Sequence, residues 1–261
     1  MSLLDPAERT RTGLKVQAEI TGATPRQPST LYESTWRDYV FAEVWTRPGL
    51  DRRSRFFIAI AGATCGDGPT GALEGFIRGA LTLGEATLAE LREASLHLAV
   101  YSGWGRGAIL DAAISRVAEE LKLAPAPYTP VRAAPWDPEV RLADGAAGFL
   151  SVMTMPGPPP VAPYYTGGIL NFVFGEMWMR PGLDERARRW ITLVGVGASS
   201  TDIPIRSHVH AAMASGNATP AEMGEFVLQY AVHCGWPRGS VMQAAVFEMI
   251  DKVAKGLAFN A

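Results

Sequence analysis

The stretch FAEVWTRPGLDRRSRFFIAIAG, which begins at Phe41, returns in altered form as FGEMWMRPGLDERARRWITLVG, which begins at Phe174. Both stretches share the run Arg-Pro-Gly-Leu-Asp and the apolar segment that follows it. The match resumes further on, after a slip of one residue, where Gly103-Trp104 corresponds to Gly235-Trp236. A pattern that recurs over this length indicates an internal structural repeat. We therefore expect one chain to contain two copies of the same unit.

Both copies carry the start signals of helices. The strings Thr87–Glu90 (TLAE) and Thr219–Glu222 (TPAE) are capping boxes, in which a threonine and a glutamate satisfy the first backbone N–H groups of a helix. Asp51 and Asp184 each follow Pro-Gly-Leu and suit the N-cap position of the next helix. Alternating patterns typical of strands are scarce. The sequence therefore predicts an all-α fold.

The region between the copies is rich in proline, as in APAPYTPVRAAPWDP and MPGPPPVAP. Proline cannot continue a helix, so we expect a linker with one short helix around Pro138 to Phe149. The predicted organisation is a first helical repeat at 1–121, a Pro-rich linker at 122–166 and a second helical repeat at 167–261.

Composition limits the possible partners. The formal net charge is −2 and the charges are scattered, so neither nucleic acid nor an acidic membrane surface is an expected partner. The N-terminal stretch MSLLDPAERTRTG lacks the apolar core of a signal peptide, and the longest apolar run, near 56–64, is too short to span a bilayer. Cys65 and Cys234 cannot build a disulfide framework. These features predict a cytoplasmic protein.

The string EVWTRPGLD, the apolar segment after it and the later string AVYSGW resemble the carboxymuconolactone decarboxylase family, which is AhpD-like. The resemblance covers most of both copies. It implies a small helical unit that associates into rings of six, so three two-copy chains would rebuild the ring as a homotrimer. The family also includes disulfide reductases with a CxxC motif. This chain has no CxxC, so we expect no dithiol redox cycle.

Positions where the copies differ are the most informative about chemistry. The chain has four histidines, none of which meets a histidine in the other copy: His97, His208, His210 and His233. The resemblance places a family histidine at His208, where the first copy has Phe76. It places a second at His97, with Tyr101 one turn later on the same helix face.

The second copy has Gln229 and His233 where the first has His97 and Tyr101. Each copy thus retains one of the two family histidine positions. We expect the two ancestral sites to have become either one working and one degenerate site, or one composite site.

Histidine is the side chain best suited to proton transfer near neutral pH. We expect His208 to be the principal general acid or base, with His233 or His97 as the second proton carrier. The alternative is that each is a hydrogen-bonded structural histidine. Glu74 stands where the second copy has Arg206, which suggests a catalytic carboxylate or, equally, a solvated helix position.

An arginine can hold a substrate carboxylate through two parallel hydrogen bonds. Arg55 and Arg188 occur in both copies and are the predicted substrate-binding residues, although an ion pair with the retained Glu43 or Glu176 would explain them as well. The expected lining of the pocket consists of Trp45, Trp178, Phe76 and Tyr101.

No metal and no cofactor are expected. The pair His208 and His210 splays its imidazoles by about 200° on a helix, which suits one metal poorly. The predicted function is a cofactor-independent enzyme that moves protons on a small lactone acid, keto acid or aromatic-derived substrate, by decarboxylation or a related lyase reaction. One alternative is an isomerase, cyclase or hydratase acting on a larger apolar substrate in aromatic catabolism or specialised metabolism. Another is a ligand-binding or structural ring protein without catalysis.

Overall fold

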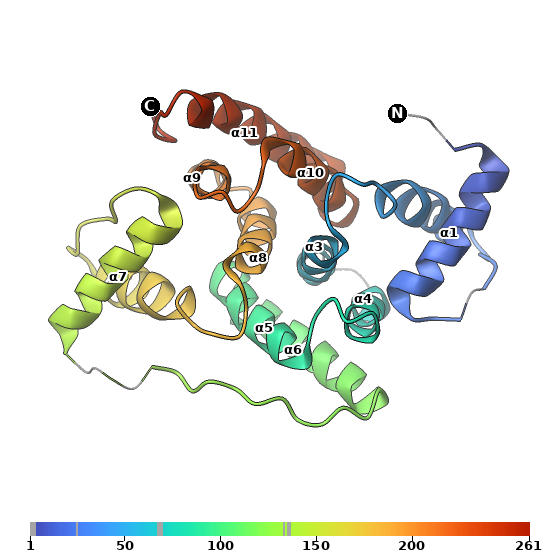
Figure 1. The fold of residues 1–261 in the computed structure, drawn as a ribbon, viewed down its shortest axis with the longest axis horizontal. Coiled ribbons are helices and arrows are strands. Elements are labelled where there is room, and N and C mark those ends of the chain that lie inside the picture. Colours follow the sequence, from blue (N-terminus) through green and yellow to red (C-terminus); the bar gives the residue numbers. More distant parts are fainter. Residues whose placement is uncertain (1–3, 25, 67–69, 133, 135–136) are drawn as a thin grey trace.

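The computed structural model describes residues 4–24, 26–66, 70–132, 134 and 137–261, and within these ranges every regular element is a helix (Figure 1). This confirms the predicted all-α fold. The first half contains α1 (Pro6–Thr21), α2 (Leu31–Thr35), the π-helix η1 (Trp36–Val44), α3 (Arg52–Cys65), α4 (Thr70–Thr82), α5 (Leu88–Ser102) and α6 (Trp104–Glu120). The second half contains α7 (Pro138–Met153), the π-helix η2 (Tyr164–Met177), α8 (Glu185–Ser199), α9 (Asp202–Ala214), α10 (Pro220–Cys234) and α11 (Trp236–Ala254).

The predicted helix starts are confirmed. The Asp51 carboxylate accepts a hydrogen bond from the backbone N–H of Ser54 at 2.8 Å, and Asp184 does the same for Ala187 at 2.8 Å. Complete capping boxes begin α5 at Thr87 and α10 at Thr219. Both helices end at a glycine with positive φ, a backbone conformation that side chains with a Cβ disfavour.

The helix in the region predicted as linker is longer than expected. Asp137 caps α7, Pro138 occupies its first turn, and the helix continues to Met153, whereas the prediction ended at 149. The π-helix η2 then begins at Tyr164, inside the predicted linker. Packing explains the extra length, because α7 lies along η2 in the way that α1 lies along η1. Figure 1 shows α1 and α7 at opposite ends of the molecule.

The retained glutamates pair with these two outer helices. Glu43 accepts an ion pair from Arg9 of α1 at 2.6 Å, and Glu176 lies 3.5 Å from Arg141 of α7. The prediction that Glu43 and Glu176 pair with Arg55 and Arg188 was therefore wrong. Arg9 and Arg141 lie outside the matched stretches, so the repeat alignment did not bring them into consideration.

At the centre of the molecule, helices of the first half pack against helices of the second half. Helices α3 and α8 lie side by side, α5 of the first half packs on α8 of the second, and α10 of the second half packs on α3 of the first (Figure 1). The crossings are close. A Cβ at Gly195 would lie 2.8 Å from Cβ of Tyr101, and a Cβ at Gly62 would lie 2.8 Å from Cβ of His233. Glycine therefore permits each contact.

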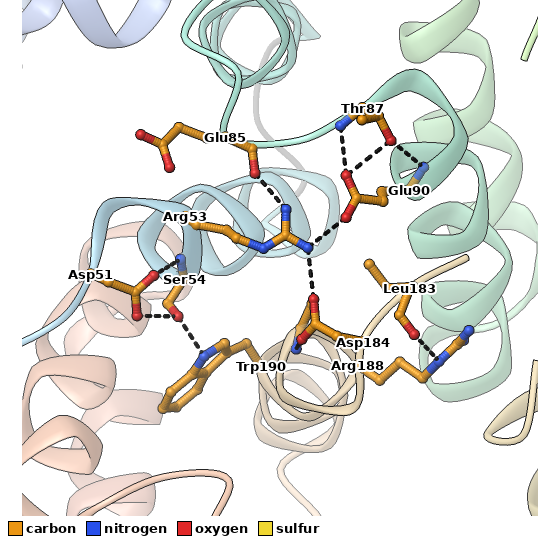
Figure 2. Close-up of polar contacts among 11 residues, drawn as sticks. Asp51, Arg53, Ser54, Glu85, Thr87, Glu90, Leu183, Asp184, Arg188 and Trp190 are labelled. Carbon is orange, nitrogen blue, oxygen red and sulfur yellow. Dashed lines mark hydrogen bonds and ion pairs between the residues drawn. The ribbon is translucent and has the colours of Figure 1, made fainter. Parts of the chain in front are cut away.

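Ion pairs hold the central contact. Arg53 of α3 donates to Asp184 and Glu90, each at 2.7 Å, and Trp190 of α8 donates to the hydroxyl of Ser54 at 2.9 Å (Figure 2). Arg186 of α8 returns the contact by pairing with Asp51 at 2.9 Å. Each N-cap aspartate thus also binds an arginine of the other half.

Candidate active site

Because helices of the two halves pack against each other, residues of both halves meet in one site. His97 and Tyr101 come from α5, and they meet Trp178 at the end of η2 and His208 on α9. The ring of Tyr101 lies with its centre 5.3 Å from that of His97 and 5.2 Å from that of His208. The ring of Trp178 lies 4.8 Å from that of His97, edge to face. We call this group the His97–His208 site.

Hydrogen bonds orient two of the rings in this site. The indole N–H of Trp178 donates to the hydroxyl of Tyr101 at 2.7 Å, and Nε2 of His97 lies 2.9 Å from the hydroxyl of Thr192 on α8. His97 and Thr192 are fully buried. In contrast, Nδ1 of His97 and Nδ1 of His208 are buried and meet no hydrogen-bond partner among the described residues. Each imidazole therefore retains a nitrogen that can exchange a proton with a bound molecule.

Burial keeps these groups neutral at pH 7. It lowers the pKa of His208 to about 3, with a smaller contribution from the charge of Arg189. The pKa of His97 is also well below its usual range, first through burial and then through the charges of Arg188 and Arg189. Burial raises the pKa of Tyr101 to about 12. The site is thus an apolar enclosure of neutral proton donors and acceptors next to a cation.

That cation, Arg189, was missed by the sequence analysis. Its side chain is completely buried, and its guanidinium carbon lies 4.8 Å from the centre of the Trp178 ring. The first copy has Phe56 at the aligned position, and it has Ala59 where the second copy has Thr192. A charge within an apolar helix of only one copy was the signal that could have identified it.

A second, equivalent site, which also draws on both halves, is packed with aromatic rings. His233 of α10 lies 5.4 Å from Phe76 and 6.0 Å from Trp36, measured between ring centres. Burial lowers the pKa of His233 to about 4. Gln229 occupies the place of His97, and its side-chain oxygen accepts a hydrogen bond from Arg55 at 2.9 Å. We call this group the Phe76–His233 site.

The comparisons with known proteins concern the half that supplies Trp178, Arg189 and His208. Residues 163–247 match the family model described as Carboxymuconolactone decarboxylase family. Residues 163–247 are therefore similar to that family. The match runs from the start of η2 into α11 and so includes the second-half residues of the His97–His208 site.

Two decarboxylases are similar to this chain. The chain is 33% identical over 88 residues to nitrosuccinic acid decarboxylase npaB of Metarhizium robertsii. The aligned residues make up 32% of this chain and 61% of the relative. The chain is also 30% identical over 89 residues to 4-carboxymuconolactone decarboxylase of Acinetobacter baylyi. This alignment covers 34% of this chain and 63% of the relative. The chain spans about three fifths of the length of the curated relatives it matches.

Several predicted site residues lie in the scaffold. Arg188 donates to the carbonyl of Leu183 at 3.3 Å, as Figure 2 shows, and to that of Arg180 at 2.8 Å. Arg55 binds Gln229 and also lies 3.0 Å from Glu225 of α10. These contacts use both arginines to join elements of the scaffold.

Other predicted residues lie apart from the His97–His208 site. Glu74 of α4 pairs with Arg116 of α6 at 2.7 Å. Trp45 and Phe76 stack on each other with ring centres 5.6 Å apart, in the Phe76–His233 site. His210 lies near the chain end, where Nε2 is 2.8 Å from the carbonyl of Leu257. In the His97–His208 site the structure therefore brings together four predicted residues, namely His97, Tyr101, Trp178 and His208.

Within the part of the chain that the structure describes, no three histidine, cysteine or acidic side chains gather in a way that could hold a metal ion. Cys65 and Cys234 are both buried, and burial raises the pKa of the Cys234 thiol to about 12. Among the same residues, no helix has the length and apolar character required to cross a bilayer.

Proposed function

We propose that this protein is a cofactor-independent lyase that decarboxylates a small acid in the His97–His208 site. One observation carries the proposal. The two histidine positions of the family resemblance, one from each half, face the same tyrosine. The Phe76–His233 site has Gln229 and Phe76 in their place. The composite site is accordingly the working site, and the Phe76–His233 site is the degenerate one.

The names of the two relatives guide the choice of substrate class. They describe acids that also bear an electron-withdrawing group, a nitro group in one case and a lactone in the other. In such an acid, the bond to the carboxylate carbon breaks and its electron pair moves into the withdrawing group. Carbon dioxide leaves, and one proton takes its place on carbon. The reaction therefore consumes one proton for each carbon dioxide released.

His208 is proposed to deliver that proton. Its free Nδ1 lies in an apolar site, and its pKa of about 3 keeps it neutral in the unliganded protein. A bound anion raises the pKa of a neighbouring imidazole and allows it to take up a proton. His97, tied to Thr192 through Nε2, is proposed to be the second carrier. Tyr101, held by Trp178, would place the substrate between them.

The test uses the full chain and two acids, nitrosuccinic acid and 4-carboxymuconolactone, with carbon dioxide release as the readout. His208→Gln and His97→Gln are expected to lower kcat by about 100-fold or more, because general acid–base groups contribute about 10²–10⁴-fold. His233→Gln is the matched control in the other site and should leave kcat within about threefold. Equal losses in His208→Gln and His233→Gln would argue against a single working site.

We also propose that the chain consists of two family units joined by a linker. Two family units, fused in one chain, explain why η1 and η2 are both π-helices and why α5 and α10 share a capping box and a terminal glycine. The second unit would begin with α7, since α7 packs on η2 as α1 packs on η1. The region before α7 would then be the linker.

A homotrimer is the proposed assembly. Trp104 and Trp236 occupy equivalent positions at the starts of α6 and α11, and 60% and 56% of their surfaces are exposed. Large exposed aromatic rings at equivalent places suit repeated contacts between chains. Light scattering is expected to give three times the chain mass of 28.0 kDa, and a mass of one chain would contradict the assembly.

A further inference from the structure

Arg189 has one nitrogen without a partner. Its Nη2 donates to the backbone carbonyl of Val152 at 2.7 Å, and its Nε donates to the side-chain oxygen of Asn217 at 3.1 Å. Its Nη1 is buried and meets no hydrogen-bond partner among the described residues. A buried donor without a partner destabilises the folded protein, and a charged donor does so more strongly. A bound acceptor would remove that destabilisation.

The charge of Arg189 is also poorly compensated. Its nearest carboxylate, Glu185, lies 3.5 Å away, but the side chain of Glu185 is 45% exposed and water screens it. Burial lowers the pKa of Arg189 to about 10, which still leaves the guanidinium charged at pH 7. By comparison, the buried Arg180 binds the equally buried Glu93 through two hydrogen bonds.

The position of this charge is specific to one site. The guanidinium lies over Trp178, whose N–H binds Tyr101, so it borders the His97–His208 site. The equivalent Phe56 lies against Trp45, with ring centres 5.0 Å apart. The Arg189 guanidinium thus borders the His97–His208 site, whereas the phenyl ring of Phe56 takes its place beside the Phe76–His233 site.

We propose that Nη1 of Arg189 binds a carboxylate or other oxyanion of the substrate that remains on the molecule after carbon dioxide has left. The inference rests on the proposed function and narrows its substrate class to acids with a second anionic group. An arginine that held the departing carboxylate would stabilise the reactant and slow the reaction. Holding a group that persists orients the reacting carbon without that penalty, and the product leaves with its anion intact.

The experiment compares two probes by calorimetric titration at pH 7.5. One is the γ-lactone carboxylate 5-oxotetrahydrofuran-2-carboxylate, which keeps its anion, and the other is its neutral methyl ester. The wild-type chain should bind the carboxylate about 10- to 100-fold more tightly, because a hydrogen bond to a charged group contributes about 1.5–3 kcal/mol. Equal binding of acid and ester by the wild-type chain overturns the proposal.

Variants assign the preference to a residue. Arg189→Phe copies the residue of the other site, and Arg189→Met is a second neutral variant if the phenylalanine variant does not fold. Either should lose the preference for the carboxylate. Arg206→Gln removes the same charge from the surface of α9 and should keep the preference. A preference that survives in a folded neutral variant at position 189 refutes the assignment.

Binding and turnover separate the two proposals. His208→Gln is expected to retain the preference for the carboxylate while losing turnover. If the wild-type chain shows the preference but consumes neither acid, the proposed reaction fails and anion recognition stands. If turnover depends on His208 but acid and ester bind equally, anion recognition fails and the proposed reaction stands.

Discussion

Replacement of Glu93 by glutamine is expected to be among the most destabilising single changes. Glu93 accepts hydrogen bonds from Arg180 at 2.9 and 2.8 Å and lies 3.7 Å from Arg188. The side chains of Glu93 and Arg180 are only 9% and 6% exposed. Glutamine keeps the shape but removes the charge that two buried guanidinium groups share. Breaking a buried ion pair in this way costs about 3–5 kcal/mol.

The chain contains a matched control for this prediction. Glu225 of α10 makes the equivalent contacts with two arginines of the first half, Arg47 at 2.6 Å and Arg55 at 3.0 Å. The side chain of Arg47 is 30% exposed, so water screens and solvates it when its partner loses its charge. Glu225→Gln should therefore cost less, about 1–2 kcal/mol, which is the loss of hydrogen bonds to a partly solvated ion.

Urea unfolding followed by circular dichroism measures both costs. We expect Glu93→Gln to lower the midpoint more than Glu225→Gln, with unchanged slopes, and the free energies of unfolding to differ by about 2 kcal/mol. If Glu225→Gln costs as much as Glu93→Gln, burial does not set the strength of these pairs and the reasoning fails.

Other properties should also be measurable. The free energy of unfolding should fall as the pH drops from about 6.5 towards 4, because the buried His233 has a pKa of about 4 and histidine in the unfolded chain takes up its proton at higher pH. His233→Gln should remove about 3 kcal/mol of this loss at pH 4. A variant with the same pH dependence of unfolding as the wild-type chain would contradict this. Gly195→Ala places a Cβ 2.8 Å from that of Tyr101 and should cost about 1–3 kcal/mol in urea unfolding, so a neutral result would show that α5 can move aside. Cys65 and Cys234 should react with Ellman's reagent in urea but not in the native protein, because both are buried, and fast native reaction would disprove that burial.

Local features of the fold could be predicted because their signals are local. An aspartate before an apolar segment, or a threonine three residues before a glutamate, satisfies backbone groups within one helical turn, whatever packs outside. Asp51, Asp184 and the two capping boxes were therefore identified correctly. The full length of α7 depends on its contact with η2, and a proline-rich neighbourhood concealed it.

The composition of the site depends on long-range packing. Sequence comparison assigned His97 to one copy and His208 to the other, and both a divided and a composite arrangement agreed with that pattern. Only the crossing of α5 onto α8 decides which histidines share a tyrosine. The sequence prediction chose Arg55 and Arg188 because both copies contain them, and it did not consider Arg189, which only one copy contains. Arg188 binds a backbone carbonyl and Arg55 binds a carboxylate, so both stabilise the scaffold.

The crossing of α5 and α10 also affects how the two sites can change over time. In an assembly of identical subunits, one mutation enters every site at once. In the proposed two-unit chain the two sites have separate codons within one gene, so a substitution at Phe76 or Gln229 leaves His97 and His208 unchanged. Because each site draws on both halves, the sites also stay physically linked while their sequences drift apart. One polypeptide can thereby place the proposed reaction in the His97–His208 site, while the aromatic packing of the Phe76–His233 site contributes to stability.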